Sequence, residues 1–521
     1  MSVPSRSKII SWYRSFFFID IAHLYKRKYP EGQFVVSVRK GTEKAKMERF
    51  VISDFQKRVI ITLFLVLLSR ILVLIPAPGI DLEVLARVVR APGRELDFSM
   101  FYLFSTFALG ITPYLSAYML VEIFSLVIPP LKTWRGEGHV GRTKLKKVSL
   151  FATFLFAFAW GYAMAKGFEG FSQIQIVKTP GLSFRLILSL TLTAGTFFMI
   201  WIADLITRRG IGHGVSVLIL AGYGISLFSS FSEIKMISYR NSSLVYFLSF
   251  FIMTVVLVTL IVWVEKSHKK ISVKFKDGLE AFLPLKITSA GITPVEWTSL
   301  LTMAPLTIYG LVDKSASQKL ILSLIPNNIW YFIAYSIGIV FLYYFFTPFF
   351  YHPKKIRTFL EKRQASIVPP PGIKEETYMG RSLMVMIPIG VFYLGLLVFT
   401  PHLILGRIFN FSLGYFGGIG LIVTVAILMD LIEEMRVRRK GNNFVKVAEL
   451  HDVPKAGLLK SILLQKGLPC HLQGYYHRAL FYFFGPYVEI SVLVPNGKVS
   501  EAVSVIKKYM DSNILTINLE T

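Results

Sequence analysis

The sequence has 521 residues, of which 53% are apolar and 17% charged, and its formal net charge at pH 7 is +27. A soluble domain usually has about 45–50% apolar residues, so the composition argues against a soluble protein. The single cysteine, Cys470, excludes an internal disulfide and a cysteine-based metal cluster. We interpret the positive charge as a membrane-loop feature and expect no direct binding of nucleic acid.

Residues 1–50 form a basic amino-terminal extension. Within it, residues 9–21 (IISWYRSFFFIDI) are apolar but short, and Arg14 interrupts them. No small-residue cleavage site follows, so we expect no cleavable signal peptide. Two interpretations stay open: a helix that lies in the membrane interface, or an unstructured tail.

Long apolar runs recur through residues 51–440. A helix needs about 20 apolar residues to cross the ~30 Å hydrocarbon layer of a bilayer. Unbroken runs of this length favour helices over the alternating strands of a barrel. We therefore predict an all-α polytopic membrane protein with ten transmembrane helices. The predicted spans lie near residues 57–76, 108–130, 148–166, 183–206, 214–231, 243–264, 290–311, 329–350, 381–400 and 413–434.

Basic residues are unevenly distributed among the connections between these spans. The connections after even-numbered spans, such as residues 131–147, 265–289 and 351–380, hold more Lys and Arg than the connections on the opposite side. Positive charge collects on the cytoplasmic side of membrane proteins. The pattern therefore predicts that these connections and both termini are cytoplasmic.

The last part of the chain changes character after the basic linker MRVRRKGNN at 435–443. FVKVAEL, PCHLQG and YVEISVLVP are strand candidates, and PKAGLLKSILLQKG and KVSEAVSVIKKYM are helix candidates. This order predicts a small α+β cytoplasmic domain over residues 441–521. It has no nucleotide-binding glycine loop and no catalytic cluster, so we interpret it as a binding or regulatory appendage. It is vaguely similar to small signal-transducing domains of unknown function.

Several segments carry a resemblance to one family. They include RILVLIPAPGID at 70–81, FALGITPYLSAYMLVEIFSLVIPPL at 107–131, WIADLITRRGIGHGVSVLILAG at 201–222, LPLKITSAGITPVEWTSLL at 283–301 and YFGGIGLIVTVAILMD at 415–430. In wording and order they resemble the SecY family of protein-conducting channels. The resemblance covers roughly residues 50–440 and leaves out both ends.

The resemblance implies an hourglass channel built from two pseudo-symmetric halves of five helices. Such a channel would pass unfolded polypeptides across the membrane and release apolar segments sideways into lipid. A ring of branched apolar side chains at its waist would seal it, because a narrow apolar pore does not hold a stable water column. Without the resemblance, ordinary packing would explain the same residues. Carried over position by position, the ring would be Ile111, Leu115, Val215, Ile219, Glu296 and Val423.

The resemblance also implies a lateral gate where the second and seventh spans face each other. Pro113, Ser116, Glu122 and Pro294 would border this gate. Each proline would loosen a backbone hydrogen bond near the start of its span, and an ordinary tolerated kink is the alternative.

The sequence departs from the family at several places. Glu296 stands where the family normally has a branched apolar residue, and Glu122 where it often has an uncharged polar one. A carboxylate near the bilayer centre is costly and marks a functional site by default. We hypothesise that both carboxylates line a hydrated path; the alternative is a one-position shift that places Glu296 in a wet vestibule. The segment between Asp81 and Leu109, which holds a plug helix in the family, is shorter than we expect and its DFSMFYLFST part lacks glycine.

The family's partners are implied in the same way. They are unfolded preproteins, membrane lipids, a SecE-like subunit and an optional SecG-like subunit, with a SecA motor or a ribosome at the cytoplasmic loops. The location implied is the cell inner (plasma) membrane. Near Gly372 the family usually has an arginine whose planar fork the neighbouring lysine cannot reproduce, so the choice between motor and ribosome stays open. The docking loops would use Lys266, Lys269, Lys270, Lys274, Lys354, Lys355, Arg357 and Lys374.

The sequence contains no P-loop, HExxH, CxxC or GxSxG arrangement, so we expect no enzyme activity, no cofactor and no metal. Two other functions stay open. Two five-helix halves with membrane carboxylates would also suit a secondary transporter of ions or small solutes. A non-conducting assembly or sensor protein could instead use the C-terminal domain as its output.

Overall fold

The computed structural model describes residues 35–36, 50–51, 53–84, 102–170, 176–224, 244–299, 301–302, 329–401, 418–439, 444–481, 488–510 and 514–516. The chain forms two compact units, Met1–Ile61 and Thr62–Thr521. In the first unit, β1 (Val35–Val36) pairs antiparallel with β2 (Phe50–Val51). The helix α3 (Asp54–Leu72) begins in the first unit and ends in the second. The interfacial helix predicted at 9–21 lies outside the described residues.

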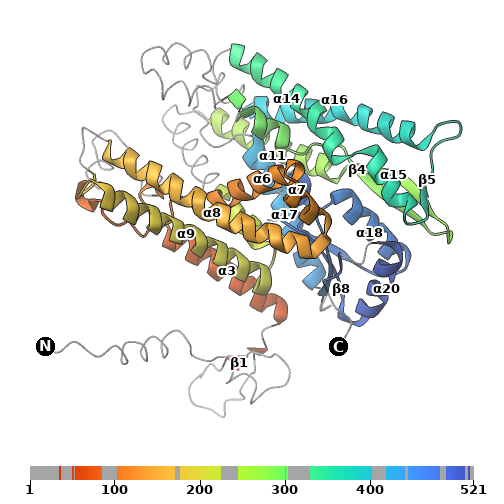
Figure 1. The fold of residues 1–521 in the computed structure, drawn as a ribbon, viewed down its shortest axis with the longest axis horizontal. Helices are drawn as coiled ribbons and strands as arrows, with labels where there is room; N and C mark the ends of the chain where they lie inside the picture. Colours follow the sequence, from red (N-terminus) through yellow and green to blue (C-terminus); the bar gives the residue numbers. More distant parts are fainter. Residues whose placement is uncertain are drawn as a thin grey trace. The chain divides into compact units, whose positions relative to one another are not determined.

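The second unit is mostly helical (Figure 1). In the described part of the chain, five helices are long and apolar enough to cross a membrane, and a bent pair of helices adds a sixth candidate. Every predicted span overlaps a described helix, although residues 214–224 and 293–299 form short ones. These helices agree with a multi-pass membrane protein. The total of ten transmembrane helices and their arrangement in two pseudo-symmetric halves stay predictions. The helices are α6 (Thr112–Val127), α7 (Pro129–Gly136), α8 (Gly138–Glu169), α9 (Leu182–Arg209), Gly214–Gly224, α11 (Leu244–Lys266), α14 (Ile329–Phe350), α16 (Glu375–Pro401) and α17 (Gly418–Arg439).

Prolines set where α6 and α7 begin. Pro113 occupies the first turn of α6, and Pro129 and Pro130 begin α7 after a bend of 98°. Pro294 likewise lies in the first turn of the helix that starts at residue 293. A proline in a first turn removes no intrahelical hydrogen bond, because the N–H groups there have no partner in the helix. The loosened hydrogen bond expected at Pro113 and Pro294 is therefore wrong.

Close helix packing depends on small residues at the contacts. A Cβ at Gly161 of α8 would lie 2.9 Å from Ser189 Cα of α9. A Cβ at Gly390 of α16 would lie 1.9 Å from the Tyr343 hydroxyl of α14. Small residues let helix backbones approach closely, which is how helices associate when lipid removes the hydrophobic drive between them.

A three-stranded sheet extends from the ends of α11 and α14. β3 (His268–Phe275) and β4 (Glu280–Lys286) form an antiparallel hairpin, and β5 (Ala365–Ile367) pairs with β3 to give the order β4-β3-β5. Gly278 turns the hairpin at φ +83°, a conformation that favours glycine. The short helix α15 (Pro353–Glu361) precedes β5. These three strands were not predicted from the sequence.

The tail forms a second three-stranded antiparallel sheet of order β6-β8-β7. Its strands and two of its helices occur where the sequence predicts them. The exception is α19, a six-residue helix that the sequence analysis missed. The elements are β6 (Phe444–Leu450), α18 (Val453–Gln465), β7 (His471–Gln473), α19 (Tyr475–Leu480), β8 (Ile490–Pro495), η3 (Asn496–Lys498) and α20 (Val499–Tyr509).

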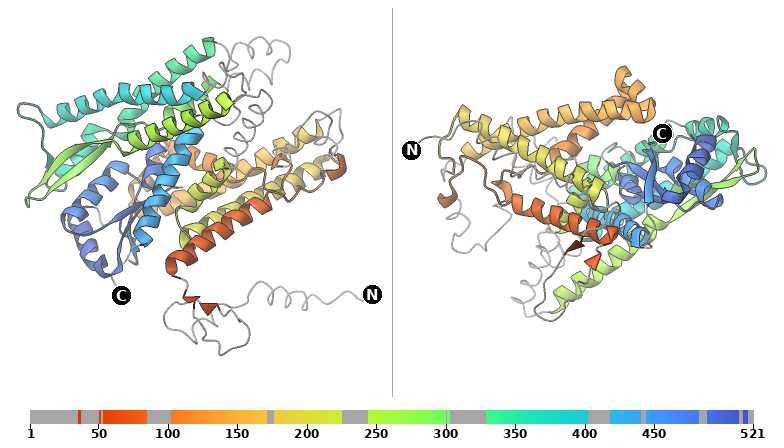
Figure 2. Two further views of the ribbon diagram at one scale, coloured as in Figure 1. Left: turned by 180° about the vertical axis from the view of Figure 1, so that it is seen from behind. Right: turned by 90° about the horizontal axis from the view of Figure 1, so that it is seen from below.

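The tail lies beside the β3–β4 hairpin (Figure 2), and one hydrophobic core joins the two sheets. Ile271 and Leu283 of the β3–β4 hairpin and Met379 of α16 belong to the same buried cluster as Leu459 of α18 and Val492 of β8. A shared core of this kind excludes water from both partners and resists separation. The boundary at residue 441 stays a prediction, and the tail is firmly docked on the hairpin.

Candidate functional site

The six predicted ring positions fall on four elements. Ile111 directly precedes α6 and Leu115 lies in its first turn. Val215 and Ile219 lie on the helix Gly214–Gly224. Glu296 lies on the helix that begins at residue 293, and Val423 lies on α17. Ile111, Val215 and Val423 are buried, whereas Leu115, Ile219 and Glu296 are partly exposed.

Contacts bring two of these four elements together, and a third lies within electrostatic reach of them. A Cβ at Gly420 of α17 would lie 3.0 Å from Tyr223 Cε1 of the helix Gly214–Gly224. At the other end of that helix pair, a Cβ at Gly212 would lie 2.4 Å from Leu431 Cδ2. Tyr223 also interacts electrostatically with Glu296. The predicted fifth and tenth spans are therefore in contact, the seventh lies within electrostatic reach of the fifth, and the ring itself stays a prediction.

Buried polar atoms without hydrogen-bond partners occur beside the ring positions. In the described part of the chain they include Thr293 Oγ1, Glu296 Oε2, Trp297 Nε1 and Thr424 Oγ1. Such atoms are rare in native proteins and call for an explanation, such as water or a ligand. Three of them lie on the seventh predicted span and one directly follows Val423. This distribution suits a passage that water or a polar chain enters.

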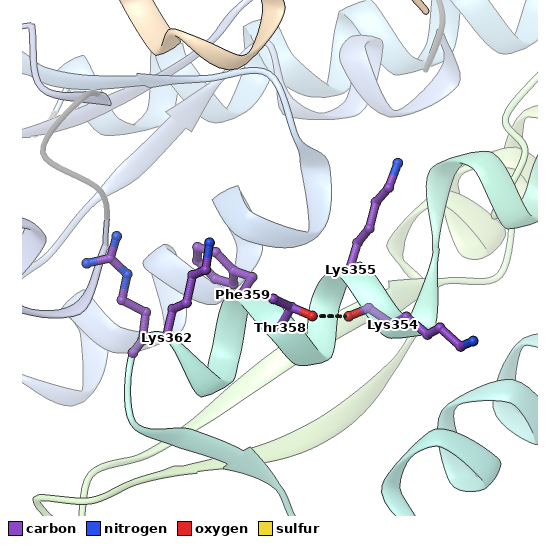
Figure 3. Close-up of a pocket in the computed structure, with 6 residues that line it drawn as sticks. Lys354, Lys355, Thr358, Phe359 and Lys362 are labelled. Carbon is purple, nitrogen blue, oxygen red and sulfur yellow. Dashed lines mark hydrogen bonds between the residues drawn. The ribbon is translucent and has the colours of Figure 1, made fainter. Parts of the chain in front are cut away.

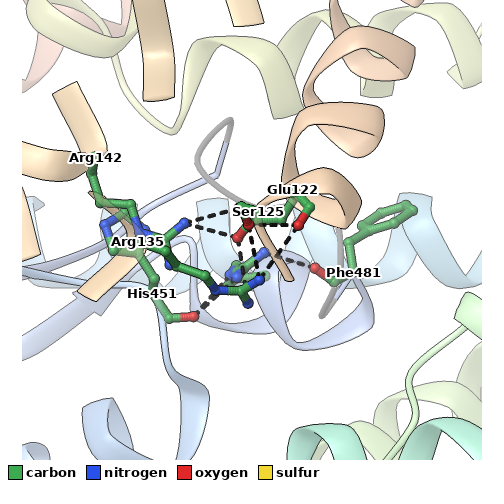
Figure 4. A network of polar contacts seen from close by, with 7 residues as sticks. Glu122, Ser125, Arg135, Arg142, His451 and Phe481 are labelled. Carbon is green, nitrogen blue, oxygen red and sulfur yellow. Dashed lines mark hydrogen bonds and ion pairs between the residues drawn. The ribbon is translucent and has the colours of Figure 1, made fainter. Parts of the chain in front are cut away.

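Glu122, a predicted gate residue, lies at the centre of a buried ion-pair network (Figure 4). Arg142 Nη1 of α8 lies 2.8 Å from Glu122 Oε1, and Arg135 Nη2 of α7 lies 3.6 Å from the same oxygen. Arg135 Nη1 also donates to Ser125 Oγ at 3.1 Å. The network ties α6 to α7 and α8. In the sequence, Arg135 and Arg142 look like charges of the basic connection 131–147, and the structure shows that both are partners of Glu122.

Of the other predicted gate residues, Pro113 and Pro294 lie in the first turns of their helices, and Ser116 lies in the second turn of α6. Pro113 and Pro294 are buried, and Ser116 is partly exposed. Pro294 O accepts a hydrogen bond from Thr298 Oγ1 at 2.7 Å. Whether these residues border a gate stays a prediction.

A helix of the tail contacts the elements that carry ring positions. Asp430 of α17 accepts hydrogen bonds from the backbone N–H groups of Tyr476, at 3.0 Å, and His477, at 2.9 Å, in α19. His477 Nδ1 lies 2.5 Å from Ser216 Oγ. At the other end of α19, Ile292 N donates to Leu480 O at 3.0 Å. No sequence pattern predicts these contacts, because the six residues of α19 (YYHRAL) are too few for a helix to be predicted from them.

Further polar contacts surround α19. Tyr476 donates its hydroxyl hydrogen to Glu433 Oε1 at 3.1 Å. Arg478, which is buried, donates through Nη1 to Phe481 O at 2.8 Å and through Nε to His451 O at 3.1 Å. Its charge also acts on Glu122. The helix is therefore held by side chains and by backbone, and it lies within electrostatic reach of the network in Figure 4.

A second buried ion pair lies at the base of the hairpin. Lys286 Nζ of β4 lies 2.5 Å from Glu265 Oε2 of α11, and both side chains are almost fully buried. The same Nζ lies 5.5 Å from the centre of the Tyr476 ring. Lys286 lies in the basic connection 265–289, and burial next to a carboxylate distinguishes it from the other basic residues there.

The predicted docking residues lie on the hairpin and around α15. Lys269 Nζ donates to Ser382 Oγ at 2.9 Å, and Arg357 pairs with Glu361 at 2.7 Å and Glu376 at 2.9 Å. A cavity of about 360 Å³ runs along α15 and has a strongly basic lining (Figure 3). Its lining residues are Lys354, Lys355, Thr358, Phe359, Lys362 and Arg363. The remaining docking candidates are Lys266 at the end of α11, Lys270 and Lys274 on β3, and Lys374 just before α16.

A metal site finds no support in the described residues, where no three His, Cys, Asp or Glu side chains gather as ligands would. The plug segment predicted between Asp81 and Leu109 lies largely outside the described residues.

The chain is similar to several known proteins. The family model SecY matches residues 105–432. "Protein translocase subunit SecY 1" of Lactobacillus kefiranofaciens subsp. kefiranofaciens is 26% identical over 428 residues, covering 75% of this chain and 97% of that protein. "Protein translocase subunit SecY" of Aquifex aeolicus (strain VF5) is 28% identical over 429 residues, covering 76% and 98%. A solved structure titled "The structure of a protein conducting channel" has a TM-score of 0.45 and 15% identity, covering 78% and 95%.

Proposed function

The chain belongs to the SecY family, and from this premise we propose that it is the channel subunit of a protein translocase. It passes unfolded polypeptides across a membrane and releases apolar segments sideways into lipid. The match of the SecY family over residues 105–432, more than half of the chain, is the observation that carries this proposal. The similar relatives are named protein translocase subunits and are matched over nearly their whole length.

The polypeptide path runs past the six ring positions. Two of the elements that carry them pack together at Gly420 and Gly212, and Glu296 of a third lies within electrostatic reach of Tyr223, which supports a common passage. Apolar side chains at Ile111, Val215 and Val423 would keep a narrow waist free of water. The unpartnered Glu296 Oε2 gives this waist a polar side that the family normally lacks.

Lateral release would occur between α6 and the helix that begins at residue 293. Both elements begin with a proline in the first turn, so each helix can start abruptly beside the passage without losing a hydrogen bond. Glu122 and its arginines anchor the far end of α6 to α7 and α8. We propose that α6 moves with these two helices as a unit.

The protein supplies a path and draws its energy from a partner. Unfolded preproteins and lipids would be its direct partners, with a SecE-like subunit, and a SecG-like subunit as an addition. A SecA motor or a ribosome would approach the basic side chains of β3 and α15. We place the protein in the cell inner membrane with both termini in the cytoplasm, because the basic connections face that side.

Two alternatives remain open to experiment. A secondary transporter would use membrane carboxylates, but Glu122 is already paired with Arg142 and Arg135, which leaves Glu296 as the better candidate. A non-conducting sensor would signal through the tail. Saturable uptake of a small solute would favour the transporter, and copurification of a SecE-like subunit with trapped preprotein would favour the channel.

Site-specific photocrosslinking tests the channel directly. A photoreactive residue is placed at Ile111, Val215 or Val423, and a secretory chain is stalled during export. Matched controls at Val256 of α11 and Phe392 of α16 use side chains that are 58% and 72% exposed and therefore face outward from the protein. Crosslinks to the stalled chain from the first three positions and not from the controls are expected. Crosslinks to lipid alone from all five positions would reject the channel.

A further inference from the structure

We propose that the C-terminal domain is a built-in inhibitor of the channel, in which α19 fastens the cytoplasmic ends of pore-lining helices together and must detach before a polypeptide enters. The inference rests on the proposed function and adds to it a closed state in which the protein's own C-terminal domain blocks the channel. It assigns a role to a tail helix that contacts the membrane helices next to ring positions.

The contacts of α19 lie next to ring positions. Ser216, which His477 contacts, directly follows Val215. Asp430 lies seven residues after Val423, which is about two turns of a helix, so both side chains share one side of α17. Three elements that carry ring positions are thus touched by one six-residue helix, because α19 also reaches Ile292, four residues before Glu296.

At Gly291 the backbone that precedes the helix starting at residue 293 comes very close to the backbone of α19. Gly291 has φ +58°, and a Cβ there would lie 2.1 Å from Leu480 O. The next residue, Ile292, donates its backbone N–H to Leu480 O. Any side chain at position 291 would therefore push α19 away from the start of the seventh predicted span, which makes this glycine a requirement of the closed arrangement.

The His477 side chain is neutral in its contact with Ser216. The ring is fully buried, and burial, together with the nearby positive charges, lowers the pKa of His477 to about 3. His213 and Arg478 are the groups whose charges act on it. His477 therefore stays neutral throughout the physiological pH range, and an entering chain or a docking partner would detach α19 by displacing it.

The rest of the tail is fixed to the cytoplasmic hairpin. Phe282 N of β4 donates to Ser461 Oγ of α18 at 2.9 Å, and a Cβ at Gly457 would lie 2.2 Å from Pro284 Cγ. Asp277 pairs with Lys508 at 2.8 Å. These contacts hold α18 and α20 on the hairpin, whereas α19 contributes Ala479 to the shared core and is hydrogen-bonded to the membrane helices. Gly474, at φ +76°, directly precedes α19 and would serve as its hinge.

A reversible crosslink tests the inference in the full-length protein. In a Cys470→Ser background, Ser216→Cys with His477→Cys ties α19 to the helix Gly214–Gly224 through a short, reducible thiol crosslinker. When about nine-tenths of the protein is crosslinked, export of a secretory reporter should fall about tenfold, because activity follows the competent fraction. Reduction of the crosslink should restore export. Asp430→Cys with Tyr476→Cys provides a second, independent lock in case the first pair does not fold.

The matched control ties the same domain at a different place. Asp277→Cys with Lys508→Cys, bridged by the same reagent, joins α20 to the hairpin turn and leaves α19 untouched. Export should stay within about twofold of the unbridged variant, because this bridge does not restrict the competent state. Equal inhibition by both bridges would contradict a specific role for α19.

The outcomes separate the two proposals. Full export while α19 is locked would overturn the inference and leave the channel intact. Absence of the crosslink in resting membranes, with the control crosslink forming normally, would also overturn it, because α19 would then not occupy the closed position. Failure of the reduced variants and the parent protein to export any reporter would overturn the proposed function itself, and the inference with it.

Discussion

Arg142 Nη1 lies 2.8 Å from Glu122 Oε1, although the two residues belong to different helices and both side chains are almost completely buried. The pair forms because α7 turns back by 98° after α6 and allows α8 to return beside it. Arg135 of α7 adds a second positive charge at 3.6 Å. A buried carboxylate with two arginines is an anchor that holds three helices in one arrangement.

Arg142→Met should destabilise the protein by about 3–5 kcal/mol, because removal of one partner leaves an incompletely compensated buried charge. The double variant Glu122→Gln with Arg142→Met should recover part of this loss. Thermal unfolding of the full-length protein in lipid nanodiscs measures both. Lys144→Ala is the matched control: it breaks the exposed pair with Glu137 and should cost no more than about 1 kcal/mol. Equal effects of Arg142→Met and Lys144→Ala would contradict the anchor.

Glu296→Ile restores the branched apolar residue that the family has at this position. It should lower small-ion leak through the resting channel, because an apolar ring excludes water better than one that contains a carboxyl group. Ion flux from vesicles that contain the purified protein measures the leak, and export of a secretory reporter is followed in parallel. Glu296→Gln keeps the polarity and shape and should leave the leak near the parent value. If leak and export both match the parent in Glu296→Ile, Glu296 has no part in the passage.

Gly291→Ala should detach α19 from the start of the seventh predicted span. The new Cβ would collide with Leu480 O, and the left-handed backbone adds about 1–2 kcal/mol of strain. The measurement is the rate at which a membrane-impermeant maleimide labels Ser216→Cys in a Cys470→Ser background. Gly278→Ala is a matched control, because it also has a left-handed φ of +83° but its Cβ would meet open space. Faster labelling is expected for Gly291→Ala alone, and equal rates would contradict the contact.

The stability of the tail against the hairpin should depend on acid through Asp277. Hydrogen bonds from Lys508 and Tyr509 lower the pKa of Asp277 to about 2. A carboxyl group whose pKa is lower in the folded state stabilises fully above its unfolded value and loses that contribution as the pH falls through the folded value. The stabilisation should therefore be present at pH 5 and fade between about pH 4 and pH 2.

Lys508→Met should remove much of this dependence. The difference in unfolding temperature between the parent and Lys508→Met should shrink as the pH is lowered from 5 to 2, measured on the full-length protein. Lys274→Met is the control, since its pair with Glu280 at 3.7 Å is exposed on both sides. A difference that stays constant with pH would show that Asp277 does not carry the effect.

Part of the fold was predictable because its causes are local. Long apolar runs become helices wherever the backbone must satisfy its own hydrogen bonds, so α9, α11 and α14 lie where the sequence places them. The β3–β4 hairpin also had a local signal that was missed. Ile271, Val273 and Phe275 alternate with polar residues, and Asp277-Gly278 is a turn dipeptide.

Other features had no local signal. α19 is too short for a periodic pattern, and its stability comes from Asp430, which lies 46 residues before Tyr476 in the chain. The arginine partners of Glu122 look like loop residues in the sequence and become buried only after the chain bends at Pro129 and Pro130. Lys286 resembles its neighbours in the hairpin, and burial beside Glu265 separates it from them.

The sequence by itself determined the class of protein, the placement of its apolar helices and the strands of its tail, because composition and periodicity act over a few neighbouring residues. Its motifs also indicated the SecY family. Only the tertiary structure decided that the tail shares a core with the hairpin and that α19 reaches Ser216, Ile292 and Asp430. These contacts join residues far apart in the chain, and long-range packing leaves no pattern in any short stretch of sequence.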